Sequence, residues 1–88
     1  MNELNQTIHQ PVRLRIMAAL TGLDAGTRVN FTALRDFLQV TDGNLGSHLR
    51  KLEDPGYITV EKSFVGRKPH TYVIVTSLGQ QAFAERRN

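Results

Sequence analysis

Apolar residues in the first quarter of the chain recur every three or four positions, the spacing that gathers them on one face of a helix. Leu4 and Ile8 lie four apart and predict a short N-terminal helix before Pro11. Pro11 suits a first helical position, where its missing N–H is not needed. The spacing continues through Val12, Ile16, Ala19, Leu20 and Leu23. It predicts a second helix over Pro11–Thr21, with Gly22 at its end.

Two further helices are predicted in close succession. The first is marked by Phe31, Leu34, Phe37 and Leu38, at helical spacing. It runs from Phe31 to Leu38 and is followed by only Gln39 and Val40. Thr41 then provides an N-cap for a helix that reaches Glu53. Because so short a turn joins the two, they are predicted to form a helix-turn-helix unit.

From Tyr57 onward, the spacing of apolar residues changes from the three or four positions of a helix to the two positions of a strand. Tyr57–Ser63 alternates apolar and polar residues, and Thr71–Val75 is rich in β-branched residues, so both are predicted strands. The segment Phe64–Pro69 between them is basic, and Gly66 and Pro69 are its expected turn residues. The pattern therefore predicts an antiparallel hairpin with a positively charged tip.

The chain is expected to finish in a helix over Ser77–Arg87 that is capped by Thr76. A stub of strand is expected at 28–30. Helices that pack with a small antiparallel sheet make an α+β fold. With 88 residues, the chain has room for one domain, residues 1–88.

Composition narrows the function. There are 11 Lys and Arg against 8 Asp and Glu, a net charge of +3, with a pI of about 9.8. That balance favours a polyanionic partner. The absence of cysteine excludes a disulfide scaffold and a thiolate zinc finger. The histidines fall on three separate predicted elements and no catalytic constellation is visible, so we expect no metal, no cofactor and no enzyme.

The predicted helix after Thr41 carries two different stripes. Leu45, Leu49 and Leu52 form an apolar stripe that should face the core. A second, polar stripe is formed by Asn44, Ser47, His48 and Lys51. Asparagine can pair with an adenine edge, and lysine can reach guanine or phosphate. Gly43 and Gly46 each weaken the helix by about 1 kcal/mol, and would let it approach a DNA surface closely. The alternative for the stripe alone is a solvated helix face.

The order of these features resembles that of winged helix-turn-helix transcriptional regulators, and within them the compact MarR/ArsR-like type. The similarity rests on residues 31–57, on the hairpin Gly66–Pro69, and on Thr76-x-x-Gly79 with Phe83. It covers about residues 10–83. Gln39 departs from the pattern, because such proteins often end this helix with glycine.

The resemblance implies that the helix from Thr41 is the recognition helix and that the hairpin is the wing. Carried over by position, the residues that would face DNA are Thr41, Gly43, Asn44, Ser47, His48, Lys51, Arg67 and Lys68. His48 is expected to be exposed and neutral. Metal-sensing relatives need clustered thiolates, which this chain lacks.

We therefore expect a sequence-specific regulator that binds double-stranded DNA, by family likeness a repressor. Met1–Gln6 lacks the pattern of a secretion signal and no apolar run could span a bilayer, so a cytoplasmic protein is expected. Nothing in the pattern indicates a small-molecule effector. The alternative is a winged-helix module that binds protein rather than a DNA sequence.

A homodimer is expected from apolar surface that a small domain can hardly cover. The strand Thr71–Val75 is apolar on both sides, and the Leu4 and Ile8 pair adds to it. Segments 1–9 and 77–88 are accordingly possible dimerisation elements.

Overall fold

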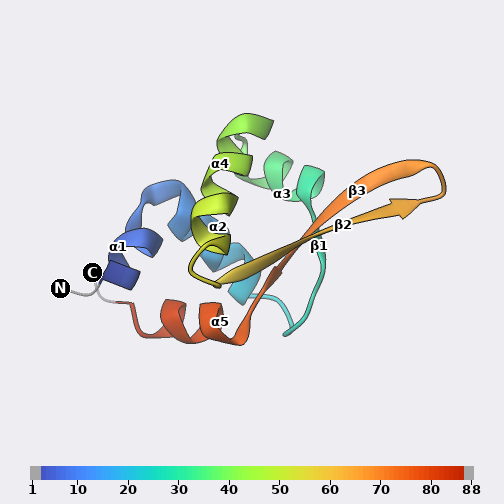
Figure 1. Cartoon of the computed structure of the whole chain (residues 1–88). Helices are drawn as coiled ribbons and strands as arrows, with labels where there is room; N and C mark the ends of the chain where they lie inside the picture. The colour runs from blue at the N-terminus through green and yellow to red at the C-terminus, as the bar shows by residue number, and fades with distance from the viewer. Residues whose placement is uncertain (1–2, 87–88) are drawn as a thin grey trace.

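The computed structural model describes residues 3–86, with side chains from residue 6 onward. Its elements, in chain order, are α1 (Glu3–His9), α2 (Pro11–Thr21), β1 (Val29–Asn30), α3 (Phe31–Leu38), α4 (Asp42–Glu53), β2 (Ile58–Val65), β3 (Lys68–Val75) and α5 (Ser77–Ala84). The helices cluster around one core, and the β2–β3 hairpin projects from it (Figure 1). The expected α+β fold, with a helix-turn-helix unit and a wing, is confirmed.

Helices α2, α3 and α4 begin and end where the sequence pattern predicts. Their first turns are capped by side chains: Asn30 Oδ1 accepts from Ala33 N at 3.2 Å, and Thr41 Oγ1 accepts from Asn44 N at 3.1 Å. Such caps satisfy amide groups that have no partner within the helix.

The end of α3 explains the unusual residue at Gln39. Gln39 adopts a left-handed conformation, φ 58°, the only non-glycine residue to do so in the described range. Its N–H donates to Asp36 O at 3.2 Å, and Val40 N donates to Arg35 O at 3.3 Å. This bond pair is a Schellman motif, which usually has glycine at the left-handed position. The short turn is thus built despite the departure noted in the sequence.

The core is formed by one continuous set of apolar side chains. Its fully buried members include Ile8, Ile16, Met17, Leu20, Leu38, Leu45, Leu52, Tyr57, Ile58 and Val73. The three leucines of the apolar stripe on α4, which form a ridge along this helix, are all buried: Leu45, Leu49 and Leu52. Ile8 is completely enclosed, so α1 is part of the fold.

The sheet has the order β1-β3-β2 and is antiparallel throughout. The predicted hairpin tip is corrected here, because β2 continues to Val65 and β3 already starts at Lys68. The turn is reduced to Gly66 and Arg67, and Gly66 has φ +65°. A glycine first in a two-residue turn is typical of a type II′ hairpin. Pro69 is a strand residue paired with Phe64, not a turn residue.

The junction between wing and last helix explains the Thr76-x-x-Gly79 motif. Thr76 Oγ1 accepts from Gly79 N at 3.0 Å and donates to Gly56 O at 2.6 Å. A Cβ on Gly79 would lie 2.0 Å from the carbonyl oxygen of Tyr57. This glycine therefore lets α5 pack directly on the backbone at Tyr57. The helix ends at Ala84 rather than at Arg87, which lies outside the described residues.

Two premises of the expected dimer are corrected. Ile8 offers no surface because it is buried in the core of its own chain. The outer side of β3 is also partly covered, since the guanidinium of Arg28 lies 4.3 Å from the centre of the Tyr72 ring. The side chain of Leu4 lies outside the described ones. On α5, Leu78 remains 47% exposed.

No helix within residues 3–86 is long and apolar enough to cross a membrane.

Candidate nucleic-acid interface

Helix α4 buries its leucine ridge and turns a polar face to solvent. Asn44, Ser47 and Lys51 are exposed on that face. Within the described part of the chain these three side chains have no hydrogen-bond partner, so their polar groups are free for another molecule. The structure thus exposes three of the residues predicted to face DNA side by side on one helix face.

The two glycines of α4 meet no neighbour. A Cβ built on Gly43 or Gly46 would have no heavy atom within 4 Å. Nothing inside the fold therefore calls for glycine at either position, although each costs helix stability. Both glycines leave the backbone of α4 accessible on its outer side.

The first turn of α4 is fixed by charge. Arg35 on α3 donates to Asp42 Oδ1 at 2.7 Å and also pairs with Asp36 at 2.9 Å. The carboxylates of Asp42 and then Asp36 raise the pKa of Arg35 above its ordinary value. Asp42 lies in the first turn of α4, where the positive end of the helix dipole stabilises its negative charge. Thr41, which was predicted to face DNA, is exposed, and its hydroxyl oxygen caps the helix.

His48 differs from its neighbours on the stripe. It is half-buried, which corrects the expectation of an exposed ring. Its Nδ1 lies 3.2 Å from Nη1 of Arg13 on α2. Burial first, and the charge of Arg13 second, lower the pKa of His48 below its ordinary value. Burial, together with this contact between residues 35 positions apart, therefore favours the neutral ring that was expected.

Arg50 is a basic residue on α4 that the predicted stripe omitted. Arg50 is exposed. It lies seven residues after Gly43 and three after Ser47, on the side of α4 opposite the leucine ridge. The signal was present in the sequence, because the periodicity of the ridge already defines which positions point away from it.

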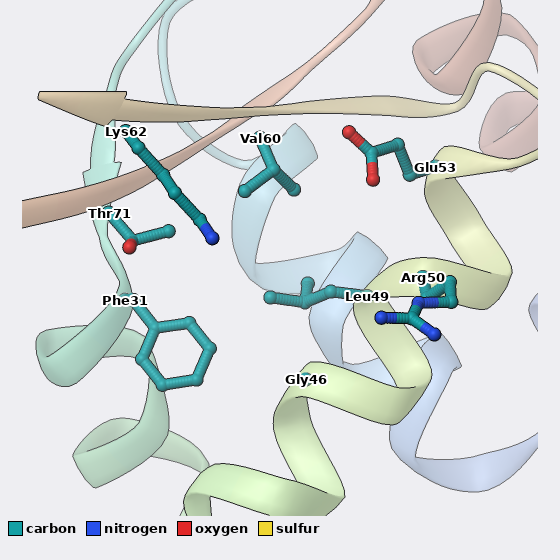
Figure 2. Close-up of a pocket in the computed structure, with 8 residues that line it drawn as sticks. All are labelled: Phe31, Gly46, Leu49, Arg50, Glu53, Val60, Lys62 and Thr71. Carbon is teal, nitrogen blue, oxygen red and sulfur yellow. The ribbon is translucent and has the colours of Figure 1, made fainter.

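A hollow of about 330 Å³ separates α4 from the wing. Its lining residues are Phe31, Gly46, Leu49, Arg50, Glu53, Val60, Lys62 and Thr71. Figure 2 shows Lys62 extending from β2 toward α4, while Arg50 lies at the α4 side. Two cations and one carboxylate, that of Glu53, thus border the hollow beside the polar face of α4.

The wing carries the remaining predicted residues. Arg67 occupies the turn and Lys68 opens β3, and both are exposed. Phe64 and Val65 beside them are also exposed, by 73% and 56%. The tip is therefore basic and partly apolar.

No three His, Asp or Glu side chains come together as a metal site within residues 3–86.

Comparison with known proteins agrees with this geometry. The chain is 39% identical over 72 residues to the uncharacterized protein MJ0432 of Methanocaldococcus jannaschii, which covers 82% of this chain and 75% of that protein. A transcriptional regulator homologue from Pyrococcus horikoshii has a similar structure, with a TM-score of 0.80 and 33% identity over 90% of this chain and 75% of that one.

Two more distant structures share the fold. MepR from a multidrug-resistant S. aureus isolate has a TM-score of 0.74 at 15% identity, over 98% of this chain and 66% of its own. HlyU from Vibrio cholerae has a TM-score of 0.64 at 16% identity, over 90% of this chain and 78% of its own. The profile of the winged helix DNA-binding domain matches residues 12–88. This chain therefore belongs to the winged helix DNA-binding domain family.

Proposed function

We propose that this protein is a transcriptional regulator that reads a specific sequence of double-stranded DNA by placing α4 in the major groove. The observation that carries the proposal is the outer face of α4. Its side chains at Asn44, Ser47 and Lys51 have no partner within the described chain, and its glycines have open space above them. A helix fits the width of the major groove, where each base pair presents a distinct pattern of donors and acceptors.

Roles follow from position and chemistry. Asn44 and Ser47 are proposed to read base edges, together with His48, because amides, hydroxyls and imidazoles can donate or accept. The proposed phosphate ligands are Arg50, Lys51, Lys62, Arg67 and Lys68. Arg50 and Lys62 border the hollow between α4 and the wing, so a backbone strand lying there would meet both charges. Glu53 opposes that contact and limits the number of phosphates the hollow can accept.

The deciding experiment is selection of bound duplexes from a random library, followed by titration of salt. A specific binder enriches one sequence, and its affinity falls linearly with the logarithm of salt concentration. Failure to enrich any sequence would contradict the proposal.

Action as a repressor is proposed by likeness to MarR/ArsR-like regulators. A reporter gene placed behind the selected sequence tests it, with the protein expected to lower transcription.

A homodimer is the proposed binding form, because two-fold assembly would present paired recognition helices to half-sites about 34 Å apart. A selected sequence with dyad symmetry supports it. Sedimentation of only a monomer at about 50 µM, both free and on the selected duplex, would contradict it.

A protein-binding module is the second candidate, favoured by an apolar groove away from α4. The groove, of about 220 Å³, is lined by Ala19, Leu20, Leu23, Val29, Ala33, Leu34 and Phe37. Phe37 is 71% exposed there. This candidate predicts weak DNA retention that is independent of sequence.

A further inference from the structure

Arg13 connects the start of α2 with the polar face of α4. Its Nε donates to Thr7 O at 2.6 Å, and its Nη1 lies 3.2 Å from His48 Nδ1. The backbone N of Arg13 is held as well, donating to Gln10 Oε1 at 2.9 Å. The guanidinium is thus fixed between a backbone carbonyl of α1 and the ring of His48.

The chemistry of this contact determines which ring nitrogen of His48 carries the proton. A guanidinium only donates hydrogen bonds. Nδ1 must therefore be the acceptor, which requires it to be unprotonated. A neutral imidazole with a bare Nδ1 carries its hydrogen on Nε2.

The second nitrogen of His48 is open to solvent. In the described range, the buried side-chain polar atoms without a partner are His9 Nε2 and the hydroxyl of Tyr57. His48 Nε2 has no partner either and is not among them, so it is accessible. His48 lies on the same polar stripe of α4 as Asn44, four residues before it, and Lys51, three residues after it. A single N–H donor is therefore presented at the edge of the proposed DNA face.

We propose that Arg13 is a positioning residue that makes His48 a dedicated donor to a purine N7 in the major groove. The inference rests on the proposed function. A histidine without this contact could present either a donor or an acceptor, and would tolerate more than one base at its position. With Nδ1 occupied by Arg13, His48 can pair only with an acceptor, such as N7 of guanine or adenine. Arg13 then sets the base preference of a residue that it holds, without touching DNA itself.

The first test uses the unaltered protein. Nitrogen-15 NMR of the ring is expected to show a bare Nδ1 and a protonated Nε2 in His48. In the duplex obtained by selection, each purine is replaced in turn by its 7-deaza analogue, which lacks the N7 acceptor. One replacement is expected to weaken binding about 3- to 10-fold, the value of one hydrogen bond.

Variants then assign that loss to the two residues. In Arg13→Met the ring is expected to become a mixture of tautomers, and the 7-deaza penalty at that position should shrink, because part of the population no longer presents a donor at Nε2. In His48→Phe, which has no donor, the penalty should disappear entirely, and this variant keeps the donor role of His48 testable if Arg13→Met fails to fold. Arg86→Met is the matched control, because it loses the same charge from a residue after α5 whose guanidinium lies over Phe83. It should retain the penalty.

Each failure points to a different error. Protonation of Nδ1 in the native protein overturns the inference before any DNA is added. A 7-deaza penalty that is unchanged in Arg13→Met, or an even loss of affinity across all sequences, overturns it while leaving the proposed function intact. Selection without any enriched sequence overturns both.

Discussion

Replacing Gly46 by alanine should change stability and DNA affinity in opposite directions. Gly46 lies in the interior of α4, where glycine costs about 0.5–1 kcal/mol relative to alanine. The added Cβ meets no heavy atom within 4 Å, so no clash offsets the gain. The free energy of unfolding should therefore rise by about 0.5–1 kcal/mol. For a domain of this size, that raises the Tm by about 2–8 °C.

On DNA the same methyl group should be harmful. If the α4 backbone lies against the groove at Gly46, the methyl group must be accommodated in a packed contact, which typically costs about 1–3 kcal/mol. The Kd would then rise about 5- to 150-fold. Thermal unfolding by circular dichroism measures the first effect, and fluorescence anisotropy with the selected duplex measures the second.

The control is Gln81→Ala on the exposed side of α5, which leaves α4 unchanged. It should keep the native Kd, which would show that an alanine on a helix surface does not itself reduce binding. A stabilised Gly46→Ala protein with native affinity would refute the idea that α4 approaches its partner closely at this position. A loss of stability would contradict the open space seen above Gly46.

Four further results are expected. Asn44→Ala should cost about 1–3 kcal/mol of binding and relax the preference at one base pair in a repeated selection; equal losses on selected and random duplexes would contradict a readout role. Lys68→Ala should weaken binding to all sequences alike and reduce the salt slope by about one unit, and an unchanged slope would exclude a phosphate contact. Gly79→Ala should destabilise the fold by about 1–3 kcal/mol or more, measured by urea denaturation, because its Cβ would overlap the carbonyl oxygen of Tyr57; native stability would show that α5 can shift without cost. Because the folded state lowers the pKa of His48, the contribution of that residue to stability should be complete above about pH 6.5 and be lost as pH falls from there through the lowered pKa. Denaturation curves of native protein and His48→Gln across that interval should converge toward acid, and parallel curves would refute it.

The bounds of α2, α3 and α4 were predictable because several local signals agree. In α4 the leucine spacing, the Thr41 cap and the acidic Asp42 all indicate the same start. The wing was predicted with strands that were too short. Gly66 and Pro69 both favour turns locally, but only Gly66 is in one. Pro69 is tolerated in β3 because β1 reaches only Val73 and Tyr72, which leaves β3 with a single neighbour at the tip.

The proposed DNA-binding face also has some features that follow from the local sequence and others that depend on residues distant along the chain. Which residues lie on the outer face of α4 follows from helical periodicity, and Arg50 could have been included on that basis. What each residue can offer to a base pair does not follow from periodicity, because it depends on partners brought together by folding. Arg13 and His48 are 35 positions apart, and only their contact specifies that His48 presents a donor. If that contact sets base preference, two winged helices with identical α4 sequences but different residues at the position of Arg13 should select different operators.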